Sequence, residues 1–140
     1  MINQLIERID TMVPQLRLVG GAIDFQAAVE NNPKATPACF VIPMREQPGP
    51  SIASDVMQQK VTASIGVVLV VRHLGDTTGA GAGNDLEVLR RQVREQIYGW
   101  TPDPAIAPLE RGAGQLLAFR DGHAWWQDLF TTSYYDRSVL

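Results

Sequence analysis

The residues best placed to do chemistry lie in a glycine-rich segment, GDTTGAGAGNDLE (75–87), between a predicted strand and a predicted helix. Backbone amides at a helix N-terminus bind phosphate, so this composition suggests a nucleotide loop. The segment lacks the GK[ST] ending of a P-loop, and Gly79, Gly81 and Gly83 do not fit G-x-G-x-x-G because residue 84 is asparagine. We therefore predict a structural loop, with a small-molecule site or enzyme using this loop and His73 as an alternative.

The remaining nucleophiles and ligands form no catalytic set. Neither His73 nor His123 has a metal-binding partner three or four residues away, and Ser64 and Ser133 lack a nucleophile elbow. Turns, helix starts and strand faces explain the carboxylates Asp76, Asp85, Asp121 and Asp128. The single cysteine, Cys39, is predicted to be a buried apolar residue. These residues predict a protein that is not an enzyme and that uses no cofactor or metal.

Length and composition predict one domain over residues 1–140. The net charge of −3 opposes broad attraction to nucleic acid. A lone cysteine fits a reducing cytoplasmic compartment. The charged N-terminus is unlike a signal peptide, and no apolar run approaches the ~18 residues of a membrane span.

Two segments predict amphipathic helices. The first ends before Pro14, and its apolar residues are Ile2, Leu5, Ile6 and Ile9. The second is predicted to begin at Asn84, which forms a capping box with Glu87, and to end at a left-handed Gly99. Its apolar stripe consists of Leu86, Leu89, Val93 and Ile97.

Strand patterns occupy much of the remaining chain. A short strand is predicted over 23–29, with a helix as the alternative, and a second strand over 38–43. Residues 43–60 contain three prolines and predict a long loop rather than a core element. Residues 61–74 alternate at first and become apolar on both sides, which predicts a central strand.

The Asp121-Gly122 pair predicts a two-residue hairpin turn. That turn would pair Arg120 with His123, Ala118 with Trp125, and Leu117 with Trp126. Both faces of this hairpin are then apolar, so both must be buried against other parts of the protein or a partner. We predict that subunit association supplies the second cover.

The chain from Val67 to Trp100 combines an apolar strand, a variable loop, a charged helix and a Gly-Trp stop before Pro102. A late aromatic strand carries Trp126 and Phe130. In this order the chain resembles the tail terminator proteins of long-tailed bacteriophages. The positions that carry the resemblance in the strand and helix are Val67, Val68, Val70, Asp85, Val88, Arg90 and Val93.

The resemblance implies an α+β fold in which a central mixed or antiparallel sheet is flanked by two main helices. It also implies a homo-oligomeric ring, expected to contain six subunits, that caps the tail tube, ends its growth and joins the head connector. Its partners would be the tail tube protein and the head-tail connector protein, with DNA passing through the lumen without sequence-specific binding. The protein would assemble in the host cytoplasm and reside in the virion tail.

The segments 43–60 and 75–84 are expected to become ordered on contact with neighbours, and the hairpin is expected to contribute a surface. The candidate interface residues are Arg45, Glu46, Gly75, Asp76, Thr77, Thr78, Gly79, Gly81, Trp125 and Leu129. Neighbouring head-completion or minor tail proteins are alternatives within the same class. A non-phage adaptor that dimerises through the aromatic hairpin is a further alternative.

Overall fold

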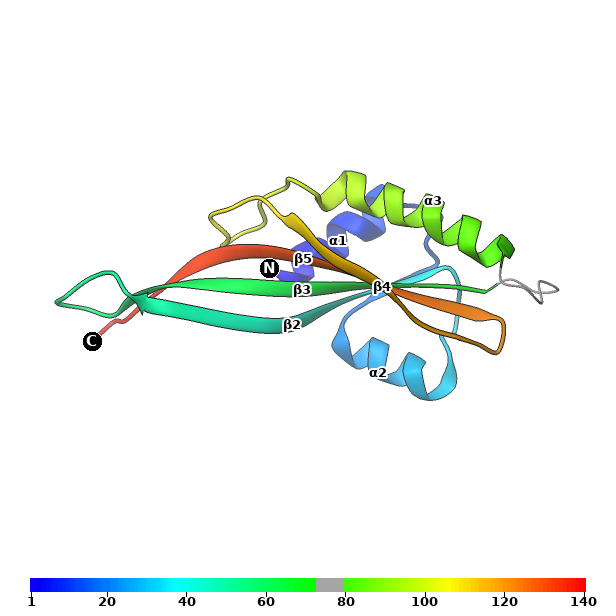
Figure 1. The fold of residues 1–140 in the computed structure, drawn as a ribbon, viewed down its shortest axis with the longest axis horizontal. Coiled ribbons are helices and arrows are strands. Elements are labelled where there is room, and N and C mark those ends of the chain that lie inside the picture. The colour runs from blue at the N-terminus through cyan, green and yellow to red at the C-terminus, as the bar shows by residue number, and fades with distance from the viewer. Residues whose placement is uncertain (73–79) are drawn as a thin grey trace.

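A five-stranded sheet forms the centre of the structure, a computed structural model that describes residues 1–72 and 80–140 (Figure 1). The strand order is β1-β2-β3-β5-β4, in which β1 and β2 are parallel and the other neighbours are antiparallel. The elements are α1 (Ile2–Met12), β1 (Leu18–Gly20), α2 (Ala22–Asn31), β2 (Ala38–Ser51), β3 (Gln58–Arg72), α3 (Ala80–Ile97), β4 (Glu110–Arg120) and β5 (His123–Arg137). The α+β prediction with a mixed sheet is confirmed.

Helices cover the two faces of the sheet unequally (Figure 1). The larger core lies under α1 and α3 and includes Leu5, Ile9, Leu69, Val93 and Ile97. A smaller core lies under α2 and includes Ala28, Phe40, Val68, Val70 and Trp125. Because α2 is short, it covers only one end of its face.

Several local predictions are confirmed. The first helix ends at Met12, ahead of Pro14. The apolar stripe of α3 is buried, and Gly99 has a φ of +80°, as the left-handed end of a helix requires. The long strand β3 is central, and all its residues from Ile65 to Val71 are buried.

The strand predicted over 23–29 is wrong, because this segment belongs to helix α2. The backbone amide of Gly21 donates a hydrogen bond of 3.0 Å to Oδ2 of Asp24, which fixes the first turn. Alternation of apolar residues suggested a strand, yet Ile23 is 85% exposed while Phe25 packs on the sheet. The helix that the sequence left as the alternative is the observed structure.

The predicted helix start at Asn84 is also wrong, since α3 begins at Ala80. Ala80 and Ala82 favour helix strongly enough to carry it through Gly81 and Gly83, which each cost about 1 kcal/mol relative to alanine. The first turn tolerates such residues because its N–H groups have no intrahelical partners in any case.

Residues 43–60 are not a loop over most of their length. They form the end of β2, the start of β3 and a short turn between them. Together with the end of β5 they make a three-stranded extension, which we call the arm (residues 43–65 and 130–137). Figure 1 shows the arm running past α2 to the far end of the molecule. Register shifts between Pro43 and Arg45 and between Pro48 and Ser51 accommodate the prolines.

The β4–β5 hairpin turns at Asp121-Gly122, where both residues have positive φ, of 53° and 71°. The pairs Arg120–His123 and Ala118–Trp125 are confirmed. The predicted pair of Leu117 with Trp126 is wrong, because a register shift brings Leu116 opposite Trp126 instead.

Candidate functional site

The outer strand β4 presents the clearest association surface. Its residues are exposed almost throughout, and one of its edges has no neighbouring strand in the described chain. Three large apolar side chains project from it in exposed positions: Leu116 at 55%, Leu117 at 40% and Phe119 at 44%. Glu110, Arg111 and Arg120 supply its only charges, all at its ends. An edge strand whose middle is uncharged and carries exposed apolar side chains favours contact with another chain.

The opposite edge of the sheet, along β1 and β2, differs from the β4 edge. Strand β1 pairs with β2 only from Ala38 to Phe40, so the rest of the β2 edge has no strand partner among the described residues. That stretch contains Pro43, Pro48 and Pro50, and proline has no N–H with which to extend a sheet. This edge is therefore protected against strand addition, whereas the β4 edge is not.

Arg45 and Glu46 lie in the arm, on opposite faces of it. Arg45 donates from Nη2 to Oε1 of Gln47 at 3.0 Å, on the face that α2 covers further along. Glu46 lies on the other face, where its Oε1 accepts a hydrogen bond of 2.9 Å from the Tyr134 hydroxyl. This hydrogen bond is the main cause that raises the pKa of Tyr134, with desolvation and the Glu46 charge adding to it.

The two hairpin candidates differ in accessibility. Trp125 is 2% exposed, and Phe25 of α2 meets its ring edge-on at 6.3 Å between centroids. The Arg120 guanidinium lies 5.3 Å from the same ring and donates to the Val29 carbonyl at 2.7 Å. Trp125 is thus covered within the protomer, while Leu129 is half-buried on the same sheet face. Interface roles for both stay predictions.

The remaining residues that the sequence singled out either have structural roles or lie outside the described residues. Gly75, Asp76, Thr77, Thr78 and Gly79 belong to the segment that the structure does not describe, as does His73, and the backbone of Gly81 lies in α3. His123 is buried, with Nδ1 2.9 Å from the Asp121 carbonyl oxygen. Burial raises the pKa of the Cys39 thiol to about 12.

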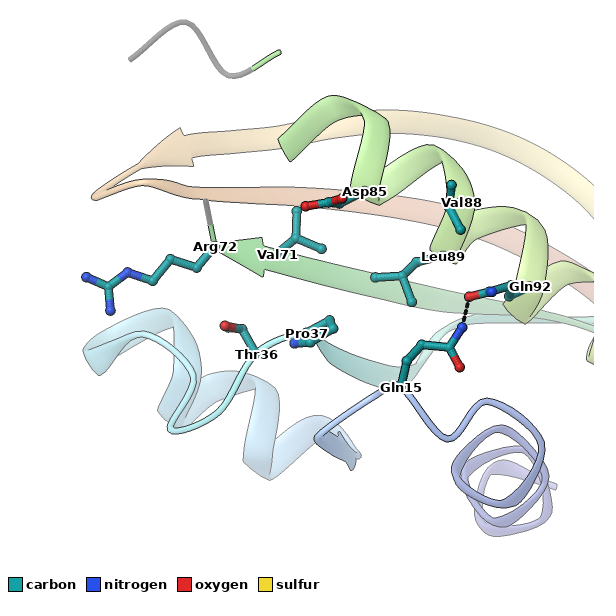
Figure 2. A pocket seen from close by; sticks show the side chains of 9 residues that line it. All are labelled: Gln15, Thr36, Pro37, Val71, Arg72, Asp85, Val88, Leu89 and Gln92. Atoms are coloured by element: carbon teal, nitrogen blue, oxygen red, sulfur yellow. Dashed lines mark hydrogen bonds between the residues drawn. The ribbon is translucent and has the colours of Figure 1, made fainter. Parts of the chain in front are cut away.

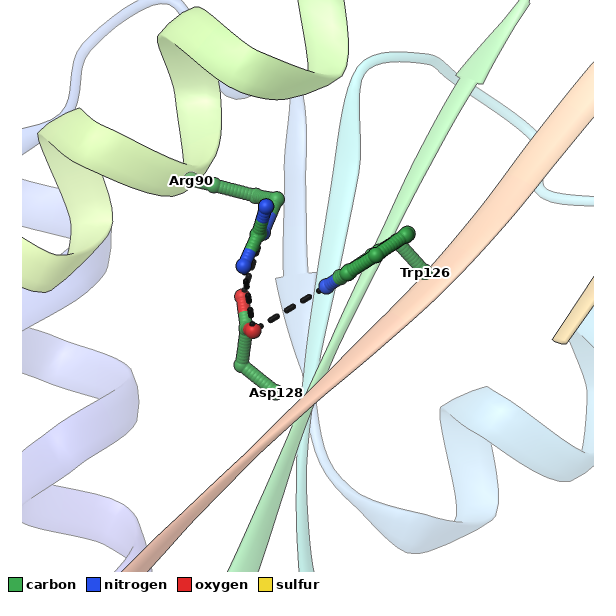
Figure 3. A network of polar contacts seen from close by, with 3 residues as sticks. All are labelled: Arg90, Trp126 and Asp128. Carbon is green, nitrogen blue, oxygen red and sulfur yellow. Dashed lines mark hydrogen bonds and ion pairs between the residues drawn. The ribbon is translucent and has the colours of Figure 1, made fainter. Parts of the chain in front are cut away.

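A polar network that the sequence did not reveal clamps α3 to the sheet (Figure 3). Arg90 donates from Nε and Nη2 to the two carboxylate oxygens of Asp128, each at 2.9 Å. Asp128 also accepts from Trp126 Nε1 at 3.0 Å, and the Arg90 guanidinium lies 4.2 Å from the Trp126 ring centre. Gly114 of β4 lies against this network, since a Cβ there would come within 2.6 Å of Asp128 Oδ1.

A pocket of about 280 Å³ lies between α3 and the chain segments beneath its first half (Figure 2). Val71, Val88 and Leu89 provide apolar walls, and Gln15 donates a hydrogen bond to Gln92 at the rim. The charged groups of the lining are Arg72 and Asp85. These two side chains come from different elements. Among the described residues that line the pocket, Thr36 carries the only hydroxyl group and there is no histidine or cysteine.

Two features are absent from residues 1–72 and 80–140, a metal-binding cluster and a membrane-spanning helix. No group of three histidine, cysteine or acidic side chains there is arranged to hold a metal ion. None of the helices in that part of the chain has both the length and the apolar character needed to cross a membrane.

Comparison with known proteins identifies relatives of this fold. The family model for the phage tail terminator protein matches residues 2–138. A chain from the virion of a native gene transfer agent particle has a similar fold, with a TM-score of 0.57 at 9% identity, and the match covers 96% of this chain and 92% of that one. No curated protein matches the chain.

The family match extends over nearly the whole sequence, so it includes the sheet, all three helices and the arm. The similar virion chain is too distant in sequence to add more than agreement in fold. The chain belongs to the phage tail terminator protein family and is a structural protein of a phage-type tail.

Proposed function

We propose that this protein caps the end of a polymerised tail tube as a ring of six subunits, stops tube growth and forms the surface that joins the head. The observation that carries the proposal is the inequality of its two long sheet edges. β4 exposes apolar side chains on an open edge, whereas prolines protect the β2 edge. Unlike surfaces associate head to tail, and such contacts close into rings when the rotation between subunits permits.

In this proposal the β4 surface packs on a different part of the neighbouring subunit. Burial of Leu116, Leu117 and Phe119 would contribute the apolar centre that stable interfaces need. Leu129, from the adjacent strand β5, lies on the α2 face of the sheet with Trp125, whereas Leu116 and Phe119 lie on the α3 face. In the proposal the neighbouring subunit would contact both faces beside the β4 edge.

The arm and the segment at 75–81 are the proposed contacts with the tail tube protein and the head-tail connector protein. The arm reaches well beyond α2, so its exposed side chains, including Arg45 and Glu46, are available to a partner stacked on the ring (Figure 1). We assign Gly75 to Gly79 and Gly81 to the same role on their composition. Assembly in the host cytoplasm would precede incorporation into the virion tail, with no catalytic step and no cofactor.

A small-molecule or enzymatic role would need a site that gathers reactive groups. The pocket in Figure 2 is the best candidate in the described chain, and its lining is mainly apolar and amide in character. Binding of a metabolite there would not require the exposed β4 surface. The ring cap accounts for that surface, so we favour it.

The decisive experiment removes the gene and examines the particles by electron microscopy. We expect tails of uncontrolled length that fail to join heads, and rescue by the wild-type gene. Normal tails with heads attached would refute the proposal, and normal-length tails without heads would move the protein to the head-completion class.

A second experiment tests the β4 surface. Leu116→Glu should prevent rescue and reduce the purified protein to monomers in light scattering. The matched control is Ile23→Glu, which changes an even more exposed residue on α2 and should leave both results unchanged.

A further inference from the structure

The two faces of the arm carry opposite charges. Side chains alternate along a strand, so the register places Arg45, Lys60 and Arg137 on one face. Glu46 and Asp136 lie on the other face. A chain with a net charge of −3 thus concentrates basic side chains on one surface of its arm.

The basic surface, which we call the open face, lies on the side of the sheet that α2 covers only at its other end. Figure 1 shows β2, β3 and β5 continuing past α2 with no helix on that side. Arg45, Lys60 and Arg137 are all exposed. Between them the open face presents hydroxyl groups from Thr62, Ser64 and Thr131.

The spacing of the basic residues suits an extended polyanion rather than a single small ion. Arg45 lies beside Ser64, Lys60 beside Tyr135, and Arg137 beside Gln58. At about 3.3 Å per residue, the three positive charges span roughly 20 Å along the strands. Phosphates of duplex DNA are spread over a comparable length, and they accept hydrogen bonds from arginine, lysine, serine and threonine side chains.

The chemistry of the open face favours nucleic acid over a protein partner. The centre of a protein interface is usually apolar and depleted of charge. The β4 surface has that character, whereas the region between Arg45 and Arg137 is mainly hydroxylic and basic. No helix lies on this side of the arm that could enter a DNA groove (Figure 1), so contact would be limited to the backbone.

We infer that the open face binds the phosphate backbone of duplex DNA without reading its sequence. This inference rests on the proposed ring, because only a ring with the open face directed to its lumen would present several copies of that face to one duplex. One carboxylate opposes the contact: Glu110 pairs with Thr131 and borders a shallow groove with Lys60. A modest affinity that leaves DNA free to move is therefore expected.

The test uses the purified full-length protein and a fluorescent duplex of about 30 base pairs, with binding followed by anisotropy at several salt concentrations. For three phosphate contacts per chain, affinity should fall about 40-fold between 50 and 200 mM salt. The variant Arg45→Gln/Lys60→Gln/Arg137→Gln should lose most of this salt dependence. Glu110→Gln should bind more tightly than wild type, because it removes the opposing charge.

A control variant removes the same amount of charge from exposed positions outside the arm, Arg17→Gln/Lys34→Gln/Arg91→Gln. Equal loss of binding in both triple variants would refute the open face as the site, as would unchanged binding in the arm variant. If the arm variant alters the oligomeric mass but not DNA binding, the open face belongs to a protein contact and the inference is wrong.

Failure of the DNA-binding inference can be distinguished from failure of the proposed ring cap. Tail length in electron micrographs tests the ring cap, and anisotropy tests the open face. The double variant Lys60→Gln/Arg137→Gln leaves Arg45, a proposed partner contact, unchanged; it should bind DNA more weakly, and a phage carrying it should still make tails of normal length. Abnormal length with that variant would show that the open face serves termination instead of DNA contact.

Discussion

Replacing Gly114 with alanine should weaken the clamp between α3 and the sheet. The new Cβ would lie 2.6 Å from Asp128 Oδ1 and 3.2 Å from Trp126 Cζ2, which is too close for either atom to keep its place. Asp128 is the group that must move, and it holds both hydrogen bonds from Arg90. The substitution therefore acts on a salt bridge that it does not itself contain.

The size of the effect follows from the exposure of that salt bridge. Hydrogen bonds to charged groups contribute about 1.5–3 kcal/mol when buried, and exposed ion pairs about 0–1 kcal/mol. The side chains of Arg90 and Asp128 are 21% and 15% exposed, so the pair lies between these limits. We expect Gly114→Ala to lower the free energy of unfolding by about 1–3 kcal/mol, or the melting temperature by about 3–10 °C.

The stability change caused by Gly114→Ala should reverse its sign when Asp128 is absent. In an Asp128→Ala background the clash with the carboxylate is gone, and replacing glycine reduces the conformational entropy of the unfolded chain. Gly114→Ala should then be neutral or stabilise by about 0.4–1 kcal/mol. The coupling free energy between the two substitutions, which is the difference between these effects, would be about 1–4 kcal/mol.

Urea and thermal unfolding of the four proteins at one protomer concentration would measure this cycle, since association makes melting concentration-dependent. Gly49→Ala is the matched control, because a Cβ there meets only the Lys60 carbonyl oxygen at an ordinary 3.4 Å. Equal destabilisation by Gly114→Ala in both backgrounds would refute the reasoning, because the cost would then not pass through Asp128.

Two further predictions concern ionisation. The pKa of about 12 for Cys39 predicts that a chromogenic thiol reagent at mildly alkaline pH labels only unfolded protein, and rapid labelling of the native chain would contradict its burial. Because the raised pKa of Tyr134 depends chiefly on its hydrogen bond to Glu46, Glu46→Gln should lower that pKa toward the ordinary tyrosine value in an ultraviolet titration, whereas an unchanged titration would place the cause elsewhere. In the wild type, the stability linked to Tyr134 is present below the ordinary pKa and is lost as pH rises through the folded-state pKa.

Some features of the fold could be predicted because they depend on residues close together in the sequence. The apolar spacing of α1 and α3 predicts which side of each helix is buried. Asp121-Gly122 predicts its own turn, since both residues adopt positive φ readily. The change along β3 from alternating to wholly apolar residues predicts that it lies at the centre of the sheet.

Errors arose where a local pattern was compatible with two structures. The alternation in 23–29 fits a strand, but Gly21, Asp24 and the alanines favour a helix, and packing of Phe25 against Phe40 and Trp125 supports it. The prolines of 43–60 suggest a loop, yet they are tolerated because, among the described residues, no strand pairs with that edge of β2. In the first case packing against the sheet decided the structure, and in the second the unpaired edge of β2 allowed the prolines.

The candidate site depended still more on distant residues. The sequence by itself determined that the hairpin has two apolar faces, and it offered no catalytic set. Only the tertiary structure decided that α2 covers Trp125 while Leu116, Leu117 and Phe119 stay exposed, that Arg90 of α3 meets Asp128 of β5, and that one face of the arm is basic. The physical reason is that spacing fixes which side chains share a face, whereas cover, pairing and exposure depend on which elements pack beside that face.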